Sequence, residues 1–100
     1  MKIEGLLPVG SVVLLKGGQH RAMIIGYCQR RVENPGEIYD YVACLFPEGY
    51  ISADKNYLFN RDQIDKVYHV GYQTEGQFAF EEKIEAAITG LRNPEKADGN

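Results

Sequence analysis

Two different spacings of apolar residues divide the chain. Up to Tyr72, short runs of alternating or continuous apolar residues are separated by turn residues, as in β-strands. After Tyr72, apolar residues recur at every third or fourth position, which indicates an amphipathic helix. The pattern therefore predicts a mainly β protein of the α+β class, with about five strands before one C-terminal helix.

The predicted strands cover residues 12–15, 22–32, 38–46, 56–59 and 64–72. Both faces of the third are largely apolar, so we expect it to be a central strand, and we expect no helix between Val12 and Phe46. Asn60 is the predicted cap of a single helical turn between the last two strands. Short strands broken by turns, with one helical turn before the last strand, favour a small SH3-like β-barrel.

Glycine and proline mark the places where the chain reverses. Gly17 and Gly18 begin a predicted hairpin turn, because paired glycines adopt the positive φ that a tight turn needs. A second turn is predicted at residues 33–36, where proline precedes glycine. Gly26 interrupts the second strand and indicates a bulge or a bend.

The helix has a recognisable start and end. Thr74 and Gln77 match a capping box, in which Thr74 is the N-cap and the Gln77 side chain reaches back to it. Asn93-Pro94 ends the helix, because proline cannot continue it. The apolar stripe of this helix comprises Phe80, Ile84, Ala87, Ile88 and Leu91.

One hundred residues suffice for one domain with a core of its own. We predict a single globular domain over residues 1–93, with the β-barrel over 6–72 and the C-terminal helix over 74–92. The polar residues 94–100 would form a flexible tail.

The N-terminal apolar stretch LLPVGSVVLL resembles the core of a signal peptide. However, Glu4 precedes it, Pro8 and Gly10 interrupt it, and no small-residue cleavage site follows it. No run approaches the roughly 18 apolar residues of a membrane span. We therefore expect a cytoplasmic protein that is not inserted in a membrane.

The net charge of −3 disfavours nucleic acid as a partner, because an acidic domain lacks the field that attracts phosphate backbones. One stretch differs, since Lys16, Arg21, Arg30 and Arg31 follow one another without an intervening acidic residue. This stretch could present a nucleic-acid face with Tyr27 as a stacking platform. A solvated hairpin that balances the acidic helix is the favoured interpretation.

No residue spacing predicts a metal, a cofactor or a catalytic site. The cysteines and histidines lack the close ligand pairs of a structural zinc site, so we expect reduced cysteines and no metal. Their positions are Cys28, Cys44, His20 and His69. The chain also lacks the G-x-S-x-G nucleophile motif and the glycine pattern of a phosphate-binding loop. We therefore predict that the protein is not an enzyme and has no catalytic residues or cofactor.

Aromatic residues supply the candidate binding positions. The segment from Asp40 to Tyr72 holds five of the seven tyrosines. Phe46 and Tyr50 flank a Pro-Glu-Gly turn, where large side chains either fold onto the barrel or stay exposed to a partner. Phe78 lies off the main apolar stripe of the helix. We take Phe46, Tyr50 and Phe78 as candidate partner-binding residues, with core packing as the alternative.

Four segments carry a resemblance to a known family: LLPVGSVVLLKGG, RAMIIGY, YDYVACLFPEGYI and YLFNRDQIDKVYHVGY. In this order they resemble domain-of-unknown-function family 4176 of Gram-positive bacteria, over roughly Leu6 to Phe80. The resemblance implies genes in type VII secretion loci, beside toxins with N-terminal LXG domains. It also implies cytoplasmic accessory factors or chaperones for those toxins, and it attaches no catalytic residues to the family.

The favoured function is therefore that of a noncatalytic protein that binds the N-terminal domain of a cognate secreted toxin. An immunity or regulatory protein of the same locus is one alternative, and a small nucleic-acid-binding SH3-like domain is another. Binding to the C-terminal toxin domain would favour immunity over a chaperone role. The oligomeric state is not predicted.

Overall fold

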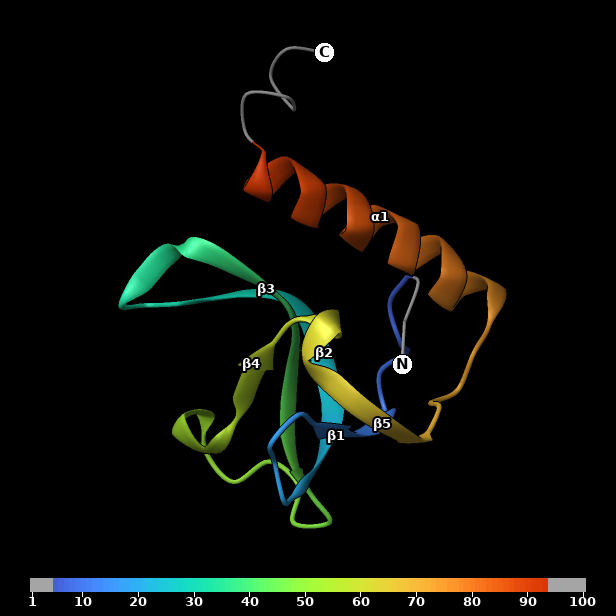
Figure 1. The fold of residues 1–100 in the computed structure, drawn as a ribbon. Coiled ribbons are helices and arrows are strands. Elements are labelled where there is room, and N and C mark those ends of the chain that lie inside the picture. The colour runs from blue at the N-terminus through green and yellow to red at the C-terminus, as the bar shows by residue number, and fades with distance from the viewer. Residues whose placement is uncertain (1–4, 94–100) are drawn as a thin grey trace.

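The computed structural model describes residues 5–93, so the predicted tail over 94–100 lies outside the described residues. It contains a five-stranded antiparallel sheet and one α-helix, α1 (Glu75–Arg92), which lies across one end of the sheet (Figure 1). Two single 3₁₀ turns, η1 (Ala53–Lys55) and η2 (Arg61–Gln63), flank the fourth strand. The strands are β1 (Val12–Leu15), β2 (Arg21–Arg31), β3 (Asn34–Phe46), β4 (Tyr57–Phe59) and β5 (Ile64–His69).

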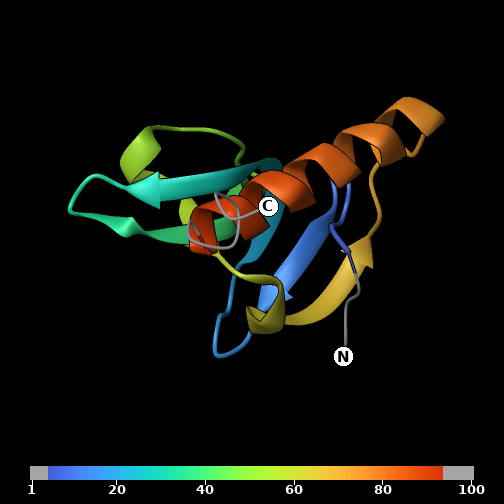
Figure 2. The ribbon, with the colours of Figure 1, turned by 90° about the horizontal axis from the view of Figure 1, so that it is seen from above.

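The strand order is β4-β3-β2-β1-β5, and all neighbouring strands are antiparallel. The predicted mainly β fold, with five strands before one helix, is confirmed. The sheet does not close into the predicted barrel, because β4 and β5 do not pair within residues 5–93. β4 is only three residues long, and η2 turns the chain into β5 before a ladder can form between them. Seen from above, α1 lies across the end of the sheet and the β2–β3 hairpin extends past it (Figure 2).

One of the two predicted hairpin turns is displaced. The β1–β2 turn lies where predicted, and Gly17 has a φ of +77° there. The β2–β3 ladder continues to the pair Arg31–Asn34, so the chain reverses at residues 32–33 rather than at 33–36. Pro35 and Gly36 then lie within β3, where the register shifts before the next pair, Arg30–Ile38. Proline has no N–H for a regular ladder, which explains an irregularity at this place.

The bulge predicted at Gly26 is confirmed. Ile24 pairs with Ala43 and Gly26 pairs with Val42, which leaves Ile25 as the extra residue of β2. An added Cβ at Gly26 would lie 3.0 Å from Val42 Cγ1. Glycine therefore also permits the close approach of β3 at this position.

The core combines residues from the sheet, the N-terminal segment and one position of α1. The Tyr41 ring lies 5.3 Å from the Phe59 ring and 6.0 Å from the Tyr27 ring, measured between centroids. Leu7 N donates to the Tyr41 hydroxyl at 2.9 Å, and the Tyr27 hydroxyl donates to Leu7 O at 2.6 Å. These tyrosines thus fasten the N-terminal segment over the core. The buried cluster is Leu6, Val13, Ala22, Ile24, Tyr27, Ile38, Tyr41, Ala43, Phe59, Ile64 and Ile88.

The N-terminus of α1 forms only half of the predicted capping box. Thr74 Oγ1 accepts a hydrogen bond from Gln77 N at 3.0 Å, as predicted for an N-cap. The Gln77 side chain does not reach back: its Nε2 donates to Glu81 Oε2 at 2.6 Å, and its Oε1 is buried without a hydrogen-bond partner among residues 5–93. Within the described part of the chain, no helix is long and apolar enough to span a membrane.

The apolar stripe of α1 only partly faces the sheet. Ile88 is 2% exposed and is the one buried residue of the helix, whereas Phe80 and Leu91 remain largely exposed. Glu81 and Glu85 lie instead on the face that contacts the rest of the protein. The orientation of α1 therefore depends on polar contacts that the apolar spacing does not reveal.

Candidate functional site

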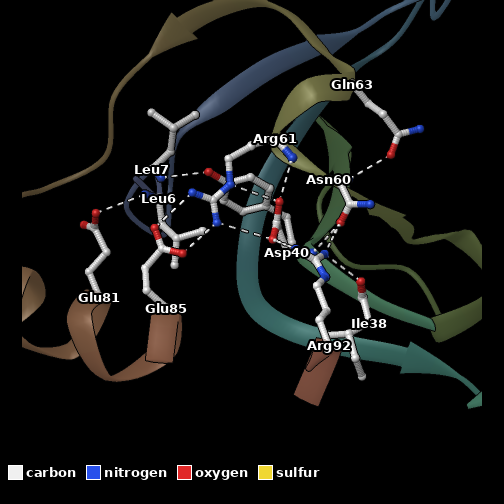
Figure 3. A network of polar contacts seen from close by, with 11 residues as sticks. Leu6, Leu7, Ile38, Asp40, Asn60, Arg61, Gln63, Glu81, Glu85 and Arg92 are labelled. Carbon is white, nitrogen blue, oxygen red and sulfur yellow. Dashed lines mark hydrogen bonds and ion pairs between the residues drawn. The ribbon is translucent and has the colours of Figure 1, made fainter. Parts of the chain in front are cut away.

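A buried carboxylate in β3 is neutralised by two arginines (Figure 3). Asp40 is 1% exposed. Arg61 of η2 donates to Asp40 Oδ2 from its backbone N–H at 2.9 Å and from Nε at 3.1 Å. Arg92 of α1 places Nη1 3.2 Å from Asp40 Oδ1. Burial by itself would raise the pKa of Asp40, but the hydrogen bonds and charges of the two arginines outweigh burial and lower the pKa.

The same two arginines connect this carboxylate to α1. Arg61 holds Glu85 through two parallel hydrogen bonds, Nη1 to Oε2 at 2.9 Å and Nη2 to Oε1 at 2.8 Å. This pairing raises the pKa of the Arg61 guanidinium, which therefore stays charged. Arg92 Nη2 donates to Ile38 O at 2.7 Å and to the side-chain oxygen of Asn60. We call Asp40, Arg61, Glu85 and Arg92 the ionic network.

The ionic network is suited to holding α1 rather than to proton transfer. Its carboxylates and guanidiniums are paired with one another across β3, η2 and α1. Asp40 is kept ionised by two cations, and a carboxylate with a lowered pKa is a weak base. Glu81 adds a further attachment, since its Oε1 accepts from Leu6 N at 3.0 Å. Figure 3 shows these contacts between the helix and the rest of the fold.

The lowered pKa of Asp40 predicts a specific loss of stability in acid. In the unfolded chain this carboxyl titrates near 3.8, and in the folded protein it titrates below that value. Its contribution is therefore complete above the unfolded pKa and is lost as the pH falls through the folded pKa. Urea unfolding of the wild type and of Asp40→Asn, from about pH 7 to about pH 2, should show a stability difference that shrinks in acid. A difference that does not change with pH would contradict this assignment.

A second group of side chains is exposed at the opposite end of the sheet. Arg21 in β2 is the register partner of Phe46 in β3, and its guanidinium carbon lies 4.3 Å from the centre of the Tyr68 ring. Tyr50 and Ile51 follow the turn after β3 and are more than half exposed. We call Arg21, Phe46, Tyr50, Ile51 and Tyr68 the aromatic patch. Aromatic rings and arginine are the residue types enriched at the centres of protein interfaces.

The structure does not bring the three predicted binding residues together. Phe46, Tyr50 and Phe78 are 37%, 62% and 51% exposed, so none of them is a buried core residue. Phe46 and Tyr50 belong to the aromatic patch. Phe78 lies on α1, which crosses the end of the sheet away from the turn after β3 (Figure 1). It lines a shallow hollow there with three glutamates.

Sequence reasoning missed the other members of the aromatic patch. Arg21 comes from β2 and Tyr68 from β5, and only the strand register places them near Phe46. The register of a sheet depends on pairing between distant segments, which a single sequence does not display. Only Ile51 could have been found from the sequence, because it directly follows the candidate residue Tyr50.

Tyr27 does not provide the stacking platform that the less favoured alternative, a nucleic-acid face, would need. The Tyr27 ring is buried between the Tyr41 and Phe80 rings, so it cannot serve as a stacking platform. Burial, and then the charge of Glu81, raise the pKa of the Tyr27 hydroxyl. Arg21 and Arg31 lie at opposite ends of β2, about 30 Å apart along an extended strand of this length. The basic residues therefore do not form one continuous stripe.

Both cysteines are free thiols in the structure. Cys44 is buried opposite Met23, and Cys28 is partly buried against the core. Across residues 5–93, no group of three or more His, Cys, Asp or Glu side chains is arranged to hold a metal ion.

Comparison with known proteins identifies one family. The model of the family described as domain of unknown function (DUF4176) matches residues 6–80. This match covers every strand of the sheet and the first turn of α1. No curated protein and no solved structure matches the chain.

Proposed function

Because the chain belongs to the DUF4176 family of unknown function, we propose that it is a noncatalytic, protein-binding accessory factor or chaperone. Its partner would be an LXG-type toxin exported by a type VII secretion system of a Gram-positive bacterium, bound through the toxin's N-terminal domain. The proposal includes a cytoplasmic location, since a chaperone of an exported protein acts before export.

The aromatic patch is the observation that carries this proposal. Its side chains come from β2, β3, β5 and the turn after β3, and they remain exposed although the chain buries a core elsewhere. Tyrosine and arginine are the side chains that most often supply binding energy at interfaces. A sheet that holds exposed tyrosine and arginine side chains in fixed positions provides a suitable surface for binding another protein.

We further propose an SH3-like relationship for this sheet. The order β4-β3-β2-β1-β5 and the single 3₁₀ turn between β4 and β5 support it. A small domain of this kind acts through its surface, and the likeness carries no catalytic implication.

Copurification with the toxin encoded beside this gene tests the proposed function. The full-length protein should retain the isolated N-terminal toxin domain, and calorimetry should give a defined stoichiometry. Retention of the C-terminal toxin domain alone would favour an immunity role instead. Retention of neither domain would overturn the proposal.

Tyr50→Ala should weaken binding to the N-terminal toxin domain by about 1–2 kcal/mol, roughly tenfold in affinity, because an exposed ring in the patch acts as an anchor. Thermal unfolding should change little, since the ring is 62% exposed and contributes little to the core. Val32→Ala is the matched control, because Val32 is 94% exposed at the tip of the β2–β3 hairpin. Equal affinities for the two variants would place the interface outside the patch.

A further inference from the structure

Neither edge of the sheet offers a regular backbone to a partner strand. β4, at one edge, is three residues long. β5, at the other edge, pairs with β1 through two register shifts, in which Asp65 and Tyr68 are the extra residues. Short edge strands, bulges and edge charges all discourage strand addition. A partner at this end of the molecule would therefore contact side chains rather than extend the sheet.

Cationic side chains accompany the aromatic ones on this face. Leu14 in β1 has Arg21 and Lys66 as its register partners on either side, and Arg21 has Phe46 as its next partner. Directly opposed residues of an antiparallel sheet project to the same face. Lys66, Leu14, Arg21 and Phe46 therefore form one row across four strands. The row itself contains two cations, Arg21 and Lys66, and no acidic residue. The row is thus positive in a chain whose net charge is −3.

The opposite end of the molecule has the reverse character. α1 carries four glutamates, and the hollow beside Phe78 is lined by three of them, Glu81, Glu82 and Glu85. An acidic ligand would be repelled there and attracted to the aromatic patch. The charge distribution therefore distinguishes the two ends of the protein for an approaching partner.

We propose that the aromatic patch binds an amphipathic helix whose apolar stripe is flanked by acidic residues. The inference rests on the proposed function, in which the N-terminal domain of the toxin is the partner that carries this helix. Apolar side chains of the helix pack on Phe46 and Tyr50, and its carboxylates pair with Arg21 and Lys66. This combination of an apolar stripe and complementary charge is a common mode of helix recognition.

Charge reversal tests the electrostatic part with the toxin domain. The double variant Arg21→Glu, Lys66→Glu should lose at least about tenfold in affinity for the N-terminal toxin domain, mostly through a slower association rate at low salt. Lys83→Glu is the control, because it also reverses a cation on an exposed residue but lies on α1. Circular dichroism of each variant confirms that the fold is kept. If Lys83→Glu lost affinity and the double variant kept it, the inference would be overturned. The proposed function would still stand, because the toxin domain would still bind.

A second experiment does not depend on the toxin. Two synthetic amphipathic helical peptides, one with leucine and glutamate and one with leucine and lysine, are titrated into the ¹⁵N-labelled full chain. The acidic peptide should shift the amide signals of the aromatic patch, and the Arg21→Glu, Lys66→Glu variant should abolish those shifts. Preference for the basic peptide, or shifts confined to α1, would overturn the inference. So would stronger binding of a single-stranded oligonucleotide at the same residues.

Discussion

Replacing Gly71 by alanine is expected to lower the free energy of unfolding by about 3 kcal/mol. Gly71 is buried, and a Cβ built on it would overlap the carbonyl oxygen of Val9. That Cβ would also lie 3.0 Å from the Val9 carbonyl carbon and 3.1 Å from Ser11 N. All of these are backbone atoms, which cannot move aside as a flexible side chain can. Gly71 N also donates to the buried Ser11 hydroxyl at 3.0 Å, so a shift of the chain would break this hydrogen bond too.

Gly36→Ala is the control for this substitution. Gly36 lies in β3, with nothing within 4 Å of the position that a Cβ would take, and its φ is not positive. Its replacement should change stability by less than about 1 kcal/mol. Urea unfolding followed by circular dichroism measures both variants. If Gly71→Ala were as stable as Gly36→Ala, the close approach of residue 71 to Val9 would not exist in solution.

Removing the buried carboxylate should destabilise the protein by about 3–5 kcal/mol, because Asp40→Ala leaves two guanidiniums without their shared partner. Arg61 and Arg92 would then lose contacts of 3.1 and 3.2 Å to a carboxylate that is almost wholly shielded from water. The effect should be greatest where the network attaches α1. Hydrogen exchange should therefore accelerate in Glu75–Arg92 more than in β1 and β2.

Glu85→Gln provides the comparison within the same network. The Glu85 side chain is 35% exposed, so its ion pair with Arg61 is partly screened by solvent. Its replacement should cost less than about 1 kcal/mol. A larger loss for Glu85→Gln than for Asp40→Ala would show that the outer ion pair, and not the buried carboxylate, holds the helix.

Features that depend on residues close together in the sequence could be predicted from the sequence. The strand and helix periods predicted five strands before one helix, and Gly26 predicted the bulge in β2. Thr74 was identified as the N-cap, because this hydrogen bond joins residues only three positions apart. The displaced β2–β3 turn shows the limit of such reasoning. There, pairing between strands carried the ladder past the residues that normally mark a turn.

The candidate site could be predicted only in part. Phe46 and Tyr50 were found because a turn between apolar runs tends to expose its large side chains. Arg21 joined them through its pairing with Phe46, Tyr68 joined them through its contact with Arg21, and Phe78 lies apart from Phe46 and Tyr50 on α1. Distances across a sheet are set by register, and register follows from the burial of a whole face.

The sequence by itself determined the kinds of element, their order and most of their ends, because these depend on side-chain period and on local hydrogen bonds. Only the tertiary structure decided that the sheet stays open and that α1 turns Glu81, Glu85 and Arg92 toward it. The apolar stripe alone would have buried Phe80 and Leu91 completely, whereas both stay partly exposed. Asp40, buried in β3, instead requires cations from η2 and α1, and an unpaired buried charge costs more than two partly exposed apolar side chains.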